Sequence, residues 1–275
     1  MTYKGTTLHW RGKRIREAAY SELMANHGLK SATDAVISGC SAGGLATFLH
    51  TDQWCDGLAA DNKGATKCVG MPDSGFFLDY QADDVPETPP SPPASGVAAR
   101  HLSKSARRIL NTLPGDYHAG LKWCFETFNA TAGVNPACIG AHHTGGPTTD
   151  DPDYLCMFAE HTAGFTHTPM FPLQSEYDAW QTGHVLKHGT DAAVVNLMGK
   201  NITSRMQANL FTNHPDSGSF LDSCHHHCGS WNSIRIDGDL VSVAFQKWYD
   251  GIGVKGSKKV WNQGKVYPCA ACCKP

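Results

Sequence analysis

The chain has 275 residues, of which 41% are hydrophobic and 17% charged, and its formal net charge is -2 at pH 7. This length is enough to bury a sizeable core, and α/β folds often reach it as one domain, so we expect a single domain over residues 1–275. The balanced charge and the lack of a long basic run exclude an electrostatic reason to expect nucleic acid or an anionic membrane as a partner. No segment is apolar over enough residues to span a bilayer.

The first predicted element is a helix over residues 11–29, which carries apolar or small residues at helical spacing and stops at Gly28. A strand follows at Asp34, and the order of helix then strand is typical of a crossover between parallel strands. We therefore predict the α/β class, with a parallel sheet and flanking helices.

The stretch from Asp34 to His50 predicts a strand, a sharp turn and a helix, with Ser41 at the turn. Gly39 and Gly43 flank this serine in a Gly-x-Ser-x-Gly pattern, which in this context is typical of a nucleophile elbow. Such a turn forces the serine into a strained backbone conformation, and the flanking glycines leave room for it. An ordinary tight turn is the alternative interpretation of the same residues.

The later elements continue the alternation of strands and helices. A proline-rich loop is predicted at about residues 81–96, and the region from residue 100 to residue 153 is expected to form a cap over the sheet. Two prolines weaken the strand predicted over residues 168–174. The remaining predictions are a strand over 68–71, helices over 101–113 and 117–128, a helix over about 191–209, a strand over 218–221 and a helix over 240–249.

The 11 cysteines are more than a reducing cytosol usually leaves without a role, and none lies in a paired C-x-x-C zinc pattern. They predict a disulfide framework, whose pairing the sequence leaves open, and the odd number leaves one cysteine without a partner in the chain. Sequons at Asn129 and Asn201 are candidate glycosylation sites that agree with secretion. The N-terminus, in contrast, has no apolar core of the kind that a signal peptide needs.

A nucleophilic serine needs a base to take its proton and an acid to orient that base. In α/β-hydrolases these groups follow in the order serine, acid, histidine, each after a later strand. Asp178 comes after the third predicted strand, and the consecutive His225, His226 and His227 come after the fourth. The chain order therefore fits a catalytic triad, while spacing alone leaves the choice among the histidines open. A helix N-cap is the alternative role for Asp178.

Four stretches resemble the pectin acetylesterase family, which includes the Notum carboxylesterases: residues 8–52 around the elbow, 73–79 (DSGFFLD), 168–181 (TPMFPLQSEYDAWQ) and the Ser-Cys-x-x-His-Cys pattern over 223–228. The resemblance implies a modified α/β-hydrolase fold, secretion, and removal of acyl groups from polysaccharide or protein esters. It also implies that Ser41 is the nucleophile, Asp178 the acid and His227 the base. The backbone N–H of Ala42 would then form part of the oxyanion hole.

The chain departs from this family before the elbow. The family places a Gly-Gly-Gly-Trp segment there, which supplies further oxyanion donors, and no such segment precedes Ser41. The first strands of the sheet are also absent, which would leave the elbow strand with an unpaired edge. We therefore expect an N-terminally incomplete esterase that is less active on p-nitrophenyl acetate than a full-length relative, since one lost oxyanion donor costs about 10²–10³ in kcat.

Asp73, Phe76 and Tyr177 are candidate residues of the substrate pocket, although aromatic residues beside strands more often belong to the core. We predict no metal and no organic cofactor, because the segment from Cys224 to Cys228 matches no common zinc site and its cysteines are expected to form disulfides that rigidify the base loop. The predicted function is a serine carboxylic-ester hydrolase, secreted or bound to a cell wall, that removes O-acetyl or other acyl groups from an extracellular polysaccharide. The alternatives are a Notum-like protein O-deacylase and a non-catalytic secreted binding homologue.

Overall fold

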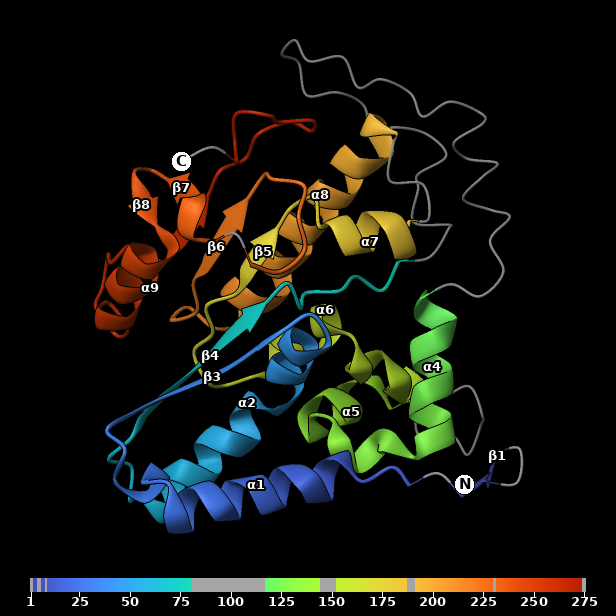
Figure 1. Cartoon of the computed structure of the whole chain (residues 1–275), viewed down its shortest axis with the longest axis vertical. Helices are drawn as coiled ribbons and strands as arrows, with labels where there is room; N and C mark the ends of the chain where they lie inside the picture. The colour runs from blue at the N-terminus through green and yellow to red at the C-terminus, as the bar shows by residue number, and fades with distance from the viewer. Residues whose placement is uncertain are drawn as a thin grey trace.

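The computed structural model describes residues 9–80, 117–143, 152–186, 191–229 and 231–273, together with the backbone of residues 2–3 and 6–7. Its centre is a five-stranded sheet with the strand order β3-β4-β5-β6-β9, in which all neighbouring strands run parallel (Figure 1). The strands are β3 (Asp34–Cys40), β4 (Lys67–Asp73), β5 (Leu173–Ser175), β6 (Ser219–Asp222) and β9 (Val260–Asn262).

Helices connect these strands and cover the sheet, and Figure 1 shows α8 and α9 on opposite sides of the strands. The helices are α1 (Gly12–Asn26), α2 (Ala42–Asp61), α4 (Tyr117–Phe128), α5 (Pro136–His142), α6 (Ala159–Thr162), α7 (Ala179–His184), α8 (Ala192–Met206) and α9 (Val241–Asp250). Short 3-10 turns are η1 (Leu29–Ser31), η3 (Ala130–Gly133), η4 (Pro152–Met157), η5 (Ala163–Phe165) and η7 (Trp231–Ser233), and a π-helical turn, η6 (Gln207–Phe211), continues α8.

Two small antiparallel pairs lie outside the main sheet. They are β1 (Thr2–Tyr3) with β2 (Thr6–Thr7), and β7 (Arg235–Ile236) with β8 (Asp239–Leu240).

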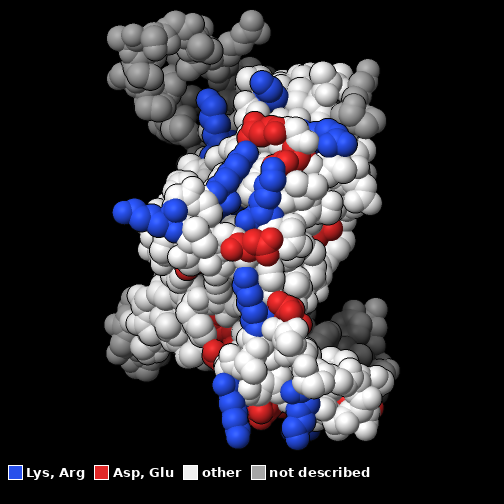
Figure 2. Space-filling model, turned by 90° about the vertical axis from the view of Figure 1, so that its left-hand side faces the viewer, with Lys and Arg blue, Asp and Glu red and all other residues white. Residues whose placement is uncertain are grey.

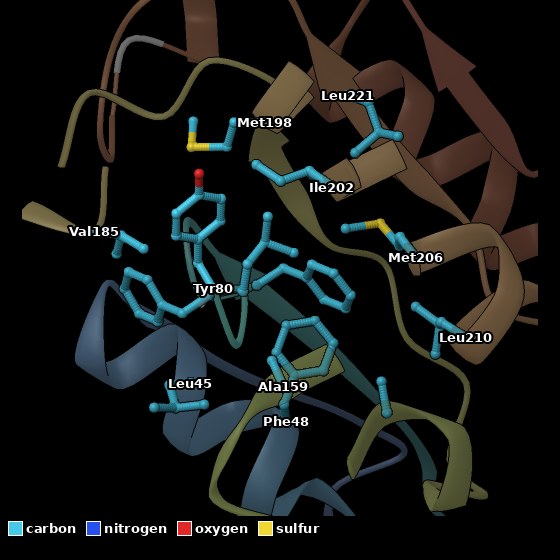
Figure 3. Close-up of a cluster of buried hydrophobic side chains, with 14 of the residues drawn as sticks. Leu45, Phe48, Tyr80, Ala159, Val185, Met198, Ile202, Met206, Leu210 and Leu221 are labelled. Atoms are coloured by element: carbon cyan, nitrogen blue, oxygen red, sulfur yellow. The ribbon is translucent and has the colours of Figure 1, made fainter. Parts of the chain in front are cut away.

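The core has one hydrophobic cluster on each face of the sheet. One cluster joins α2, α6 and α8 to the segment that follows β4 (Figure 3), and the other packs α9 against β5, β6 and β9. Leu221 belongs to the first cluster and its neighbour Phe220 to the second, because successive side chains of a strand point to opposite faces. The helices on both faces of a parallel sheet confirm the predicted α/β class.

β3 lies at an edge of the sheet, since β4 is its only strand partner in the described part of the chain. Ala35 is the one buried residue of β3, and Val36 is 43% exposed. The unpaired edge that the sequence predicted for the elbow strand is therefore present in these residues.

Most predicted elements are confirmed with shifted ends. The strand predicted over 168–174 is shorter than expected, because Pro169 and Pro172 have no N–H to donate to a neighbour; only the isolated bridge between Met170 and Gly70 precedes β5. β9 was not predicted. The loop predicted at 81–96 and the helix predicted over 101–113 lie outside the described residues.

Charges of both signs are interleaved on the face that Figure 2 shows, so this face has no block of one sign that would attract a polyanion. Ion pairs contribute to the mixture, such as Lys247 Nζ at 2.7 Å from Asp239 Oδ1. Among the described residues, no helix combines the length and the apolar character needed to cross a bilayer.

The two glycines of the elbow differ in what surrounds them. A Cβ at Gly39 would lie 2.6 Å from the carbonyl oxygen of Gly43, which is backbone and cannot swing away, whereas a Cβ at Gly43 would meet nothing within 4 Å. We expect Gly39→Ala to destabilise the fold by about 1–3 kcal/mol through overpacking. Gly43→Ala is the matched control and should be neutral or stabilising, since alanine favours a helix. Urea unfolding of both variants measures the difference, and equal stabilities would contradict this account of the turn.

Candidate active site

Ser41 occupies the sharp turn between β3 and α2. Its backbone has φ 60° and ψ -119°, a conformation that costs free energy in any residue other than glycine. The backbone N–H of Ser41 donates to the carbonyl oxygen of Asp73 at 2.9 Å, which ties the turn to the end of β4. The side chain is thereby presented at the carboxyl end of the sheet, as the elbow pattern predicted.

His227 connects Ser41 to Asp178. Its Nε2 lies 2.8 Å from Ser41 Oγ, and its Nδ1 lies 2.8 Å from Asp178 Oδ2. With the Nδ1 proton donated to the carboxylate, Nε2 is left as the acceptor for the serine hydroxyl. The structure therefore brings together the three residues that the chain order and the resemblance selected.

The contacts of Asp178 fit both of the roles considered from the sequence. It is fully buried at the N-cap of α7, where Oδ1 accepts the backbone N–H of Gln181 at 2.8 Å. Its other oxygen faces His227. Because the cap bond fixes the carboxylate, the orientation of the imidazole is set by a rigid helix end.

The neighbouring histidines have other partners. His225 Nε2 lies 2.9 Å from the hydroxyl of Thr182, and His226 Nε2 lies 3.1 Å from Asp222 Oδ2. Burial alone would lower the pKa of His226, but the hydrogen bond and the negative charge of Asp222 outweigh it and raise that pKa. The pair of His226 and the fully buried Asp222 anchors the base loop. The sequence carries no signal for this pair, because Asp222 has the pattern of an ordinary strand end.

The carbonyl oxygen of His226 also accepts the backbone N–H of Ala179 at 3.0 Å. Ala179 directly follows Asp178, so the base loop and the acid are joined by backbone as well as by side chains.

A disulfide joins the nucleophile turn to the base loop. Cys40, the residue before Ser41, is bonded to Cys228, the residue after His227. The backbone N–H of Cys228 also donates to Ser74 Oγ at 2.9 Å. The other disulfides are Cys55–Cys68, Cys138–Cys156, Cys224–Cys273 and Cys269–Cys272, and Cys124 is the unpaired cysteine. The predicted framework, the disulfides at both ends of the base loop and the odd cysteine are confirmed.

Removing the Cys40–Cys228 disulfide should affect both stability and catalysis. We expect the double variant Cys40→Ser/Cys228→Ser to lose about 2–5 kcal/mol of stability, as is usual for a native disulfide. Its kcat should fall by about 10- to 100-fold, since small displacements of reacting groups cost this much. The matched control is Cys138→Ser/Cys156→Ser, which removes a buried disulfide of the α5–η4 region. That control should lose stability and keep kcat. Equal kcat values for the two variants would show that the Cys40–Cys228 disulfide does not hold Ser41 and His227 in position.

The predicted oxyanion donor lies at the start of α2. The first bond of the helical ladder here runs from the backbone N–H of Leu45 to the carbonyl oxygen of Ser41. The N–H of Ala42 thus precedes the ladder and has no intrahelical acceptor. An N–H group in this position, at the positive end of a helix dipole, can stabilise a negative charge that forms beside Ser41.

The structure corrects two of the three pocket predictions. Phe76 is fully buried in the core, with its ring 5.7 Å from that of Phe48. Tyr177 is also buried, and its hydroxyl donates to the carbonyl oxygen of Lys265 at 2.6 Å. Both side chains turn inward because apolar surface of this size gains more from burial than from lining an open site. Asp73 does lie beside the site and accepts Trp231 Nε1–H at 3.0 Å.

Two other aromatic rings lie next to the base. The ring of Phe77 is 6.3 Å from that of His227, and the ring of Trp180 is 6.2 Å from it. The two rings also contact each other edge to face at 5.1 Å. The sequence offered no signal to choose Phe77 over Phe76, since neighbouring phenylalanines differ only in the direction they point.

The sequons lie in different surroundings. Asn129 is exposed on a turn directly after α4. Asn201 lies within α8, and the hydroxyl of Thr203 in the same sequon donates to Glu176 Oε1 at 3.0 Å. Glycosylation of Asn129 therefore stays a prediction that its position favours, whereas Asn201 is not on the surface loop that such a site usually occupies.

Comparison with known sequences identifies pectin acetylesterases as relatives. The sequence is 28% identical over 271 residues to pectin acetylesterase 5 of Arabidopsis thaliana, covering 89% of this chain and 54% of the relative. It is 28% identical over 265 residues to pectin acetylesterase 11 of the same plant, covering 90% of this chain and 57% of the relative. The chain thus spans about half the length of the curated relatives it matches.

Comparison with solved structures supports the fold. The Wnt deacylase Notum from Drosophila superposes with a TM-score of 0.65 and 18% sequence identity, covering 95% of this chain and 64% of that one. An identity this low supports likeness of fold alone, and the shared fold is that of a Notum-like α/β-hydrolase. The Pectinacetylesterase family profile matches residues 1–108 and 116–274, nearly the whole sequence, and the chain therefore belongs to the pectin acetylesterase family.

Proposed function

We propose that this chain carries the catalytic centre of a serine carboxylic-ester hydrolase that removes O-acetyl groups from an extracellular polysaccharide of the pectin class. The observation that carries the proposal is the continuous hydrogen-bonded chain from Ser41 through His227 to the buried Asp178. Serine, histidine and aspartate in this arrangement perform acyl transfer on several unrelated folds.

In the proposed reaction, Ser41 Oγ attacks the ester carbonyl while His227 Nε2 takes its proton. Asp178 stabilises the imidazolium that forms, and the N–H of Ala42 donates to the oxyanion. His227 then gives the proton to the sugar oxygen as its bond to the acyl carbon breaks, so that the sugar leaves as an alcohol. A water molecule activated by the same base then attacks the acyl-enzyme and releases the acid and Ser41. Trp180, which is partly exposed, offers apolar surface beside His227 for the acyl methyl group or the face of a sugar ring, and the buried Phe77 packs edge to face against it.

The substrate class and the location rest on further support. The curated relatives are pectin acetylesterases, and their similarity extends over 89% and 90% of this chain. The disulfides favour an oxidising compartment, as expected of a protein that acts outside the cell. A lipid-modified protein is a weaker candidate substrate, because the similarity to Notum, at 18% sequence identity, supports a shared fold and not a shared substrate.

Acetate release from O-acetylated pectin by the purified chain tests the proposal. A fluorophosphonate probe should label the chain, and acetylated pectin should be preferred over an ester with a long acyl group. A preference for the long acyl ester would favour the protein O-deacylase instead. If the folded chain neither reacts with the probe nor releases acetate, a non-catalytic binding protein is the better interpretation.

A further inference from the structure

A second polar cluster lies between the segment that follows β4 and helix α6. His161 Nε2 is 3.2 Å from Asp79 Oδ2 and 3.4 Å from Glu160 Oε1. One potential ligand atom from each of these residues lies within 4.8 Å of the others. The Asp79 and Glu160 side chains are 6% and 4% exposed, so water screens their charges poorly.

Hydrogen bonding alone explains this geometry incompletely. A single Nε2–H of His161 can donate well to one carboxylate oxygen, yet two oxygens face it, and both distances exceed the 2.7–2.9 Å of a charge-assisted bond. Ligand atoms around one ion at about 2.1 Å lie about 3.0–3.4 Å apart in octahedral or tetrahedral geometry. The two distances from His161 therefore match the spacing of ligands around one cation, and the Asp79 and Glu160 oxygens lie within 4.8 Å of each other.

Other side chains also hold the two carboxylates. His118 Nδ1 hydrogen bonds to Asp79 Oδ1, the oxygen that points away from His161. Arg205 Nη1 donates to both oxygens of Glu160, at 2.6 and 2.7 Å. Ligating carboxylates in metalloproteins are fixed by such outer partners.

The charges also fit an added cation. Among the residues of the cluster that the structure describes, two carboxylates and the Arg205 guanidinium leave a net charge of -1 when the histidines are neutral. A divalent cation would change the net charge to +1, without leaving an isolated buried charge of either sign.

We propose that Asp79, Glu160 and His161 bind one divalent transition-metal ion, with Zn²⁺ as the preferred ion. The imidazole ligand favours Zn²⁺ over Mg²⁺ and Ca²⁺, which prefer oxygen ligands. The His161 side chain is 25% exposed, which leaves room for water as a further ligand. Asp79 follows Phe77 by two residues, so the ion would hold the Phe77 ring in its position beside His227. This role is structural and does not depend on the proposed ester hydrolysis.

Isothermal titration of the oxidised, tag-free chain with Zn²⁺, after dialysis against a chelator, tests this site. We expect one equivalent to bind, with affinity lowered at least tenfold in Asp79→Asn and in His161→Gln. The matched control is His214→Gln, since His214 Nε2 donates only to the carbonyl oxygen of Gly164 among the described contacts. That variant should bind as the wild type does.

A folding defect in the variants is separated from a loss of ligands by measurements on the wild-type chain. Zn²⁺ should raise its Tm while Mg²⁺ and Ca²⁺ do not, and Co²⁺ should give the visible absorption bands of a nitrogen- and oxygen-ligated ion. The proposal is overturned if the wild-type chain binds no stoichiometric Zn²⁺, or if folded Asp79→Asn and His161→Gln bind it with unchanged affinity.

Discussion

Alanine in place of Ser41 is expected to lower kcat for the hydrolysis of p-nitrophenyl acetate by about 10⁴- to 10⁶-fold, the range seen when a triad serine is lost. The variant keeps the turn and the α2 N-terminus but has no oxygen to attack the carbonyl. Steady-state kinetics on the purified variant measure the loss, and its fluorophosphonate labelling should vanish.

Ser38→Ala is the matched control for this variant. Ser38 lies on the same strand, β3, and its hydroxyl donates to the carbonyl oxygen of Met71 at 2.8 Å, away from the base. It should keep wild-type kcat. Comparable activities of the Ser38 and Ser41 variants would show that Ser41 is not the nucleophile.

Asparagine in place of Asp178 should lower kcat by about 10⁴-fold. The side chain keeps its shape and can still accept the N–H of Gln181, so α7 stays capped. Its amide N–H₂ would donate to His227 Nδ1, however, and so place the ring proton on Nε2. In that tautomer the imidazole cannot take the proton of Ser41.

Asp191→Asn serves as the control for the change at the helix cap. Asp191 caps α8 by accepting the backbone N–H of Ala193 at 2.8 Å, and none of its described hydrogen bonds reaches the triad residues. Both variants should unfold at similar urea concentrations, and only Asp178→Asn should lose activity. If kcat falls in both variants in proportion to their loss of stability, the role of Asp178 is purely structural.

The sequence was sufficient for the architecture and for the order of the triad because both depend on local patterns. The turn at Ser41 is encoded within five residues, and the strands before Asp178 and His227 each carry their own apolar signal. Parallel strands place their carboxyl ends along one edge, so residues that follow different strands meet there without further information.

Pairings between distant segments could not be predicted in the same way. The bond between Cys40 and Cys228 depends on how the nucleophile turn meets the base loop, and no spacing in the sequence states it. The short β9 was not predicted because Val260–Asn262 is too short to show the alternation of apolar and polar residues that marks a strand. The grouping of Asp79 with Glu160 and His161 likewise appears only when α6 packs against the segment after β4.

The disulfide between Cys40 and Cys228 also determines when the catalytic centre can form during biosynthesis. Its cysteines are 188 residues apart, so the bond must wait until most of the chain has left the ribosome. Forming a disulfide takes seconds to hours, far longer than helix formation or collapse. Newly made chains would therefore acquire the proposed esterase activity at the rate of oxidation, and copies retained in a reducing compartment would have lower activity toward acetyl esters inside the cell that made them.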